Sequence, residues 1–263
     1  MGKISGLAVL VLILLTLVAG CGKKSSKETP TGPVSQSYIP FAVGNFWTYD
    51  VTPANSDSAF TATMKIVDTT SFKSEKAVIM ETRNSKNQSD WTRQYFQVSS
   101  KALLLFGWET FNASKGDTSK IFFPSPVQWV TIPFEEDKTW KIYEYSGTLD
   151  EAPLVSSVLP SADLDGDGTP DHVDLSIQGK SHKIETIQAA GKSFQSYKID
   201  ILINAQVKMS QTGLTIPYTL TFGTFYFVPE VGIVKIIQYD VSGKVTETWL
   251  LANYYLNPVI GSY

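Results

Sequence analysis

Cysteine, histidine and basic residues are scarce in this chain of 263 residues. It contains one cysteine, Cys21, and two histidines, with 22 Lys and Arg residues against 25 Asp and Glu residues. A single cysteine excludes an internal disulfide, so the fold must depend on its hydrophobic core. Two isolated histidines exclude a His-rich zinc site. The net charge of -3, without a basic stripe, argues against nucleic acid as a partner.

The first 21 residues combine a positive start, an apolar run and small residues before the cysteine. Lys3 supplies the charge, residues 7–15 form the apolar run, and the small residues 18–20 precede Cys21. This order is typical of a secretory signal, and the run is too short for a membrane span. Cleavage after residue 20 removes the charge of Lys3 and changes the net charge from -3 to -4.

Residues 18–21 resemble the lipobox of bacterial lipoproteins. The resemblance implies cleavage before Cys21, a diacylglycerol thioether on its sulfur and an acylated amine. Two or three acyl chains, at about 0.8 kcal/mol per buried CH₂, would anchor the protein durably. Gly22 is not the Asp that commonly retains lipoproteins at the inner membrane, so the resemblance implies the outer membrane, facing the periplasm or the surface. An ordinary signal peptide containing a cysteine is the alternative.

Residues 22–38 are rich in Ser, Thr, Lys, Gly and Pro and contain almost no apolar side chains. Such a segment cannot bury enough surface to order itself, and we interpret it as a flexible tether. The chain is therefore predicted to consist of a signal peptide (1–20), a lipidated cysteine with its linker (21–38) and one domain (39–263).

From residue 41 onward the apolar residues recur with a period of two. In 197–209 the odd positions are apolar, and after a short loop containing Gly213 the alternation resumes in 214–222, which predicts a hairpin. Pro217 is expected at a sheet edge or a bulge. The pattern predicts an all-β domain with a large, strongly curved antiparallel sheet or an open or half barrel, and a β-sandwich is the alternative. Further strands are expected near 46–52, 60–66, 76–82, 91–98, 102–107, 127–132, 138–145, 172–178, 183–189, 232–240 and 245–254.

Two short apolar segments, 40–49 and 231–235, resemble the opening and closing segments of a loosely defined group of secreted bacterial β-domain lipoproteins. The resemblance covers roughly residues 38–255. It implies a single domain and no known activity.

Residues 163–174 place oxygen ligands at the spacing of a twelve-residue calcium loop. Gly168 at position 6 permits the sharp turn that such a loop needs. The candidate ligands at positions 1, 3, 5, 7, 9 and 12 are Asp163, Asp165, Asp167, Thr169 through its carbonyl, Asp171 and Asp174. The stretch resembles the calcium loops of dockerin modules and of Asp-rich thrombospondin-type repeats. It departs from the EF-hand pattern at Asp174, where a longer Glu would close the site.

The alternative for this loop is a solvated turn, because Asp and Gly favour turns. Five carboxylates within twelve residues repel one another, however, and a divalent ion would relieve the repulsion. We therefore expect one structural Ca²⁺ ion. The second copy of the loop that a dockerin needs is absent.

Motifs that indicate an enzyme are weak. The segments 179–181 and 191–193 resemble the end of a phosphate-binding loop but lack its first glycine. No G-x-S-x-G segment occurs, and a Ser-His-Asp triad through His182 is only formally possible. A carboxylate pair of the glycosidase type leaves little local trace. The candidates for such a pair lie on or beside expected strands, where an exposed sheet face is the favoured explanation: Asp50, Glu81, Glu109 and Glu247.

Three function classes remain open. The first is a membrane-anchored, non-catalytic binding or envelope-assembly lipoprotein with an unknown protein partner. The second is a carrier of lipid or another hydrophobic ligand, which requires a large concave apolar pocket. The third is a hydrolase, which requires convergent carboxylates with a shifted pKa. The six tryptophans fit core packing, or a groove for an acyl chain, glycan or peptide.

Overall fold

The computed structural model describes residues 39–55, 58–72, 74–151 and 163–257. The expected signal peptide, lipidated Cys21 and linker lie outside these residues. The described chain is all β, and it contains no helix that could cross a membrane. The strands are β1 Phe46–Pro53, β2 Phe60–Phe72, β3 Glu75–Asn84, β4 Trp91–Val98, β5 Ala102–Asn112, β6 Asp117–Thr131, β7 Thr139–Thr148, β8 His172–Ala189, β9 Lys192–Lys208, β10 Thr215–Val228, β11 Gly232–Tyr239 and β12 Val245–Tyr255.

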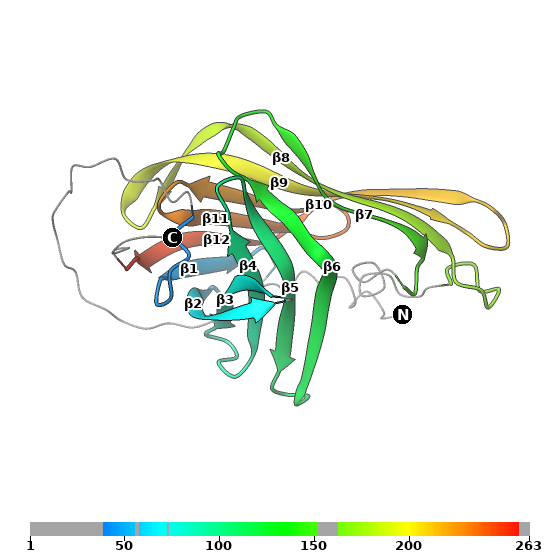
Figure 1. The fold of residues 1–263 in the computed structure, drawn as a ribbon, viewed down its shortest axis with the longest axis horizontal. Helices are drawn as coiled ribbons and strands as arrows, with labels where there is room; N and C mark the ends of the chain where they lie inside the picture. Colours follow the sequence, from blue (N-terminus) through cyan, green and yellow to red (C-terminus); the bar gives the residue numbers. More distant parts are fainter. Residues whose placement is uncertain (1–38, 56–57, 73, 152–162, 258–263) are drawn as a thin grey trace.

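All twelve strands belong to one antiparallel sheet with the order β6-β5-β4-β3-β2-β1-β12-β11-β10-β9-β8-β7. Two six-stranded meanders are therefore joined side by side through β1 and β12. The sheet curls into a nearly closed barrel (Figure 1), which confirms the strongly curved sheet and rules out the β-sandwich. The two edge strands, β6 and β7, meet where the indole nitrogen of Trp140 donates to the carbonyl oxygen of Trp129 at 3.3 Å.

Shifts in register allow strands of up to 18 residues to follow this curve. The β8–β9 ladder shifts between Ser181 and Ile184, and the β9–β10 ladder shifts between Thr221 and Gly223. Such bulges bend a strand and increase its twist. Pro217 lies in the part of β10 that pairs with β9 but not with β11, so its expected position at an edge is confirmed.

Several strands extend beyond their expected bounds, β6 and β8 among them. β6 begins at Asp117 instead of residue 127, although Pro124 and Pro126 argue against a strand there. The prolines are tolerated because β6 is an edge strand, where a missing N–H costs little. β8 continues through the expected break at 179–182, where its ladder with β9 shifts between Ser181 and Ile184 and Gly179 leaves room for the Trp140 ring.

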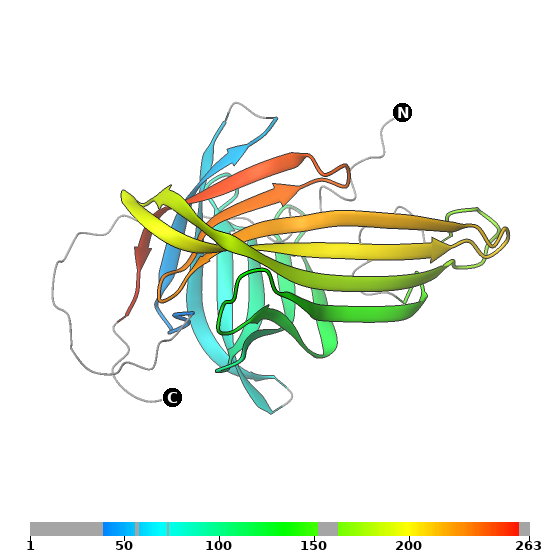
Figure 2. The same ribbon diagram turned by 90° about the horizontal axis from the view of Figure 1, so that it is seen from above.

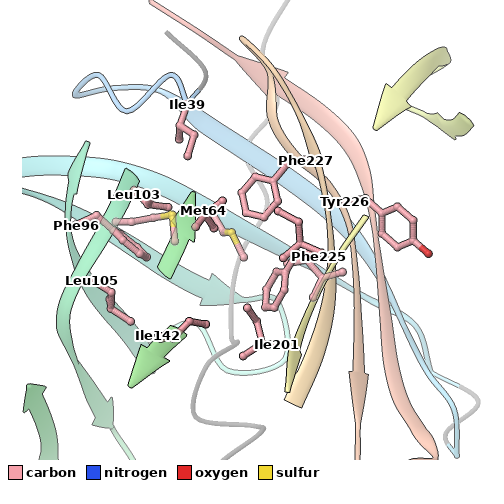
Figure 3. Close-up of a cluster of buried hydrophobic side chains, with 14 of the residues drawn as sticks. Ile39, Met64, Phe96, Leu103, Leu105, Ile142, Ile201, Phe225, Tyr226 and Phe227 are labelled. Carbon is pink, nitrogen blue, oxygen red and sulfur yellow. The ribbon is translucent and has the colours of Figure 1, made fainter. Parts of the chain in front are cut away.

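Side chains fill the barrel interior (Figure 3). Met64, Phe96, Leu103 and Phe225 point into this interior, and Tyr226, which is also buried, points to the other side of its strand. Ile39, the first described residue, is 1% exposed and packs against this core.

One part of the sheet projects beyond the barrel body (Figure 2). We define the arm as residues 143–148, 172–177, 203–208 and 215–220, which are the outer parts of β7 to β10. Here β8 pairs with β7 and β9, and β9 pairs with β10. Val173 and Val207 are buried on one face of the arm, and His172 and Lys208 are exposed on the other.

Candidate functional site

The aspartate-rich loop lies at the tip of the arm, beside the turn between β9 and β10 (Figure 2). Three of its carboxylates, those of Asp163, Asp165 and Asp171, each place an oxygen within 4.8 Å of the others. Oxygen ligands at this spacing suit a hard divalent cation such as Ca²⁺. The structure thus brings together positions 1, 3 and 9 of the predicted calcium loop.

Asp163 organises the loop backbone. Its Oδ1 accepts hydrogen bonds from the backbone N–H groups of Gly166 (2.6 Å) and Asp167 (3.2 Å), and its Oδ2 accepts one from Gly168 (2.8 Å). These donors, the Gly168 N–H first among them, lower the pKa of Asp163. Gly168 has a φ of 87°, a left-handed conformation that favours glycine, as the sequence pattern required.

The other two carboxylates join the loop to the β9–β10 turn. Asp171 is 0% exposed and accepts hydrogen bonds from the N–H groups of Leu164 (2.7 Å) and Ser210 (2.8 Å). Asp165 accepts one from the N–H of Gln211 (3.1 Å) through Oδ2. Its other oxygen, Oδ1, is buried and has no hydrogen-bond partner among the described residues.

The charge of these carboxylates is not balanced by nearby basic side chains. Within the part of the chain that the structure describes, no Lys, Arg or His forms an ion pair with Asp165 or Asp171. Like charges brought together at this distance repel one another strongly. A cation bound between the carboxylates would offset that repulsion and give the buried Oδ1 of Asp165 a partner.

The remaining three predicted ligands have other partners. Asp167 accepts hydrogen bonds from the Thr169 N–H (2.8 Å) and from the Ser210 hydroxyl (2.9 Å), and the Thr169 carbonyl lies 3.4 Å from the same hydroxyl. Asp174 lies on β8, where the Ser146 hydroxyl (2.6 Å) lowers the pKa of its exposed carboxyl. The structure therefore does not place Asp174 with the cluster.

Sequence reasoning missed the contribution of the β9–β10 turn. Ser210 lies 39 residues from Asp171, and no local motif marks it as a donor to the loop. The hairpin pattern of 197–222 predicts the β9–β10 turn. It does not predict that the aspartate-rich loop lies beside this turn.

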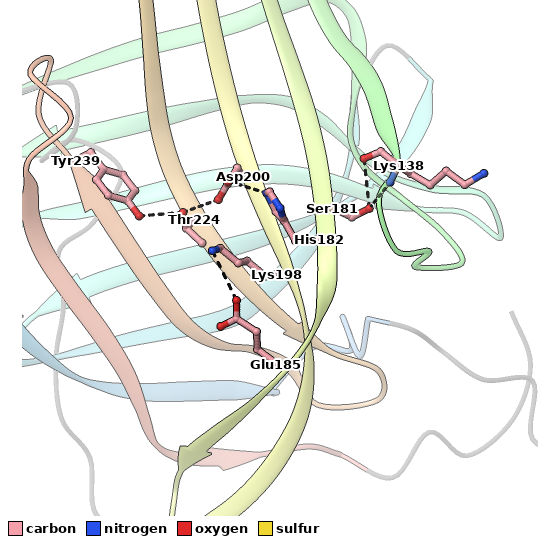
Figure 4. A network of polar contacts seen from close by, with 8 residues as sticks. All are labelled: Lys138, Ser181, His182, Glu185, Lys198, Asp200, Thr224 and Tyr239. Carbon is pink, nitrogen blue, oxygen red and sulfur yellow. Dashed lines mark hydrogen bonds and ion pairs between the residues drawn. The ribbon is translucent and has the colours of Figure 1, made fainter.

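The second candidate, an acid–base site at His182, lies on adjacent strands of the barrel wall (Figure 4). His182 Nε2 is 2.7 Å from Asp200 Oδ2, and Thr224 donates to Asp200 Oδ1 at 2.6 Å. Ser181 instead donates to the carbonyl of Glu135. Within the described ranges no hydroxyl hydrogen-bonds to His182, so the formal Ser-His-Asp triad does not form there.

Two of the candidate catalytic carboxylates form ion pairs. Glu81 lies 2.5 Å from Arg83 and 2.8 Å from Arg93. Burial opposes the charge of Glu81, but the two guanidinium groups outweigh it and lower the pKa of its carboxyl. Glu109 pairs with Lys120 at 2.7 Å. The Glu81 carboxyl therefore does not hold a proton for general acid catalysis at neutral pH.

The remaining two candidates differ in burial. Asp50 is exposed, whereas Glu247 is partly buried and accepts a hydrogen bond from the indole N–H of Trp249 at 3.0 Å. Burial raises the pKa of Glu247, against the opposing effects of Trp249 and of the charge of Lys86. Burial therefore has a larger effect on the pKa of Glu247 than the Trp249 hydrogen bond and the Lys86 charge together.

The tryptophans pack mainly into the barrel. Trp47, Trp108 and Trp249 are buried, and Trp91, Trp129 and Trp140 are partly buried. The indole N–H of Trp47 donates to the Val231 carbonyl at 2.5 Å. Core packing accounts for five of the six, and Trp91 instead stacks on Phe111 and lies under the Arg93 guanidinium.

A cavity of about 40 Å³ remains in the interior, between β2–β5 on one side and β10–β11 on the other. Its walls are mostly apolar, and two glutamines, Gln94 and Gln238, also line it. A volume of about 10–15 Å³ accommodates one water molecule, so the cavity is far smaller than a lipid.

No protein-family model and no curated relative matches the chain. It is similar to two solved structures. One is a protein of Bacteroides fragilis, inferred to be exported and described as having a YmcC-like fold, with a TM-score of 0.39 and 13% identity. The other is a protein of Parabacteroides distasonis, inferred to be a lipoprotein, with a TM-score of 0.37 and 16% identity. Each match covers 84% of this chain and 99% of the other. At these values the likeness assigns no function.

Proposed function

We propose that the chain is a lipoprotein of the cell envelope, with a non-catalytic binding or assembly domain that holds one structural calcium ion at the tip of its arm. The observation that carries the proposal is the convergence of Asp163, Asp165 and Asp171, with the buried Oδ1 of Asp165 lacking a partner. Three carboxylates supply a compact set of hard oxygen ligands, and carbonyls or water complete the shell of such an ion.

The role of the ion follows from where the loop is attached. Asp165 and Asp171 also accept hydrogen bonds from the β9–β10 turn, so an ion between them would bind the two loops at the arm tip together. The arm is only four strands wide and projects from the barrel. A divalent clamp at its end would keep these strands in register, and millimolar extracellular calcium would saturate even a weak loop.

The membrane anchor in this proposal rests on the lipobox-like residues 18–21. In this proposal residues 22–38 are the tether between the lipidated Cys21 and the barrel, whose core includes the buried Ile39. The outer membrane remains the proposed location, on the basis of Gly22.

The non-catalytic part of the proposal is supported by the interior and by the polar clusters. Packed side chains occupy the barrel, and the cavity of about 40 Å³ is too small for a whole lipid. The His182–Asp200 pair lacks a neighbouring nucleophile among the described residues. These features favour a binding or assembly scaffold over the carrier and over the hydrolase.

Calorimetric titration of the processed protein with CaCl₂ tests the metal centre directly. Asp165→Asn removes one charge from the cluster and keeps the side-chain shape, and Asp174→Asn is the matched control outside the cluster. We expect one site in the wild type and in Asp174→Asn, and none in Asp165→Asn. At a calcium concentration ten times the dissociation constant the gain is about 1.4 kcal/mol, which raises the melting temperature by roughly 3–6 °C. Identical melting of all three proteins with calcium and with a chelator would show that the metal proposal is wrong.

A further inference from the structure

Gln238 carries a polar side chain that the barrel buries without a partner. It lies on β11, is 4% exposed, and faces Gly223 on one neighbouring strand and Glu247 on the other. Neither its amide nitrogen nor its amide oxygen has a hydrogen-bond partner within the described chain. Each buried polar atom left in this state costs free energy on the order of 1–3 kcal/mol. A ligand that forms hydrogen bonds with the Gln238 amide would offset this cost.

The Gln238 amide borders the interior cavity of about 40 Å³. Gln94, which is 5% exposed on β4, lines the same cavity from the opposite meander. The other lining residues are apolar, apart from Gly223, and no charged side chain is among them. The cavity thus offers amide donors and acceptors in surroundings that disfavour a full charge.

We propose that this cavity is a binding site for the head group of a small neutral carboxamide or protonated carboxylic acid, held by paired hydrogen bonds to Gln238. A carboxamide presents one acceptor and two donors in a plane, and its complement is a group that offers one donor and one acceptor side by side. The head group has three heavy atoms. That number agrees with a cavity with room for about three water-sized groups.

The apolar remainder of the ligand would leave the cavity past lining residues that are partly exposed. Phe41, Trp129 and Phe222 also line it, and all three are partly exposed rather than buried. The proposal takes the apolar tail of the ligand out of the cavity past these three side chains. Met64 and Met80, on the wall formed by β2 and β3, are flexible side chains that can adjust to a short alkyl chain.

Butyramide is a suitable probe because it carries this head group, has a short tail and does not partition strongly into detergent. Processed protein in detergent micelles is titrated with butyramide, and binding is followed by the melting temperature and by the ¹⁵N signals of glutamine side-chain amides. We expect saturable binding, a rise in melting temperature and a shift of the Gln238 amide signal. Butyrate at pH 7 is the charged counterpart and should bind at least about tenfold more weakly.

Gln238→Met keeps the length of the side chain and removes both hydrogen-bonding atoms. It should fold, because an apolar side chain in a buried site removes an unsatisfied group, and it should weaken butyramide binding about tenfold to a hundredfold. Gln188→Met, on the exposed part of β8, is the matched control and should bind as the wild type does. If butyramide produces no saturable effect, or if Gln238→Met binds it equally well, the proposal is wrong. Both titrations are made in the presence of a chelator, which removes any effect of calcium on the melting temperature and so separates this site from the metal centre.

Discussion

The hydroxyl of Tyr49 donates a hydrogen bond to the carbonyl oxygen of Ile233 at 2.9 Å, although 184 residues separate them in the chain. Tyr49 lies on β1 and Ile233 on β11, and β12 lies between these strands in the sheet. The bond therefore connects the first meander with the second across an intervening strand. Burial raises the pKa of Tyr49, so its hydroxyl remains a neutral donor at physiological pH.

Removal of that hydroxyl should weaken the junction of the meanders. Tyr49→Phe leaves the Ile233 carbonyl without its donor in a buried site, and we expect a loss of about 1–3 kcal/mol in the free energy of unfolding. Urea denaturation measures it. Tyr255→Phe, whose parent side chain is 51% exposed at the end of β12, is the control and should change little. Equal midpoints for the two variants would contradict the bridging role.

The Tyr49–Ile233 contact also shows which parts of the fold the sequence predicts and which it does not. Segments 40–49 and 231–235 were singled out only as short apolar resemblances, and the structure joins them through Tyr49–Ile233 and Trp47–Val231. Strand positions followed from the period of two, because alternating burial imposes that period. The order of the strands in the sheet did not follow from this period, because pairing between distant strands depends on the whole sheet.

The early start of β6 did not follow from the sequence. Its first half contains Pro124 and Pro126, which the structure tolerates because β6 is an edge strand that needs no N–H on its outer side. At the arm tip, the carboxylates of 163–171 were evident from their spacing, since the ligands are local. The hydrogen bonds from Ser210 and Gln211 were not, because they reach the loop only through tertiary structure.

Gly179 should be essential for the contact between the two edges of the sheet. A Cβ added there would lie 2.2 Å from the Trp140 ring, whose N–H reaches Trp129 on β6. We expect Gly179→Ala to lower stability by about 1–3 kcal/mol through overpacking. Trp140→Ala removes the obstacle, so adding Gly179→Ala to it should cost much less. A double-mutant cycle measures this coupling, and additive effects would argue against the clash.

Asp171 should stabilise the arm tip even without a metal ion. Its buried carboxylate accepts the N–H groups of Leu164 and Ser210, and Asp171→Ala leaves both donors unsatisfied. We expect a loss of about 1–3 kcal/mol in the presence of a chelator. Asp174→Ala, which alters an exposed carboxylate on β8, should stay within about 0.5 kcal/mol. Thermal unfolding in chelator distinguishes them, and a wild-type midpoint for Asp171→Ala would refute this role.

Cys21 should determine whether the protein stays with the membrane. If its sulfur carries the diacylglycerol group, Cys21→Ala removes both the acyl chains and the processing site. The variant should then be unprocessed or recovered in the aqueous phase after detergent phase separation, whereas the wild type partitions into the detergent phase. Ser25→Ala, in the same linker, is a control that should behave as the wild type does. Persistent detergent partitioning of Cys21→Ala would point to another anchor.

Glu247 should make stability depend on pH in a direction opposite to that of an ion-paired carboxylate. Burial raises its pKa above the ordinary value of 4.5, so the folded protein keeps the proton to a higher pH than the unfolded chain does. Between the two pKa values folding takes up a proton, and the contribution to stability is present below about 4.5 and lost as pH rises through the folded pKa.

Glu247→Gln removes this titration and keeps an acceptor for the Trp249 indole. We expect its melting temperature to exceed that of the wild type at pH 7 and the difference to shrink toward pH 4. Glu144→Gln, at an exposed carboxylate paired with Lys141, is the control for loss of one surface charge. Melting curves from pH 4 to pH 8 measure the effect. A difference between Glu247→Gln and wild type that stays constant over this range would show that the Glu247 carboxyl titrates alike in the folded and unfolded chains.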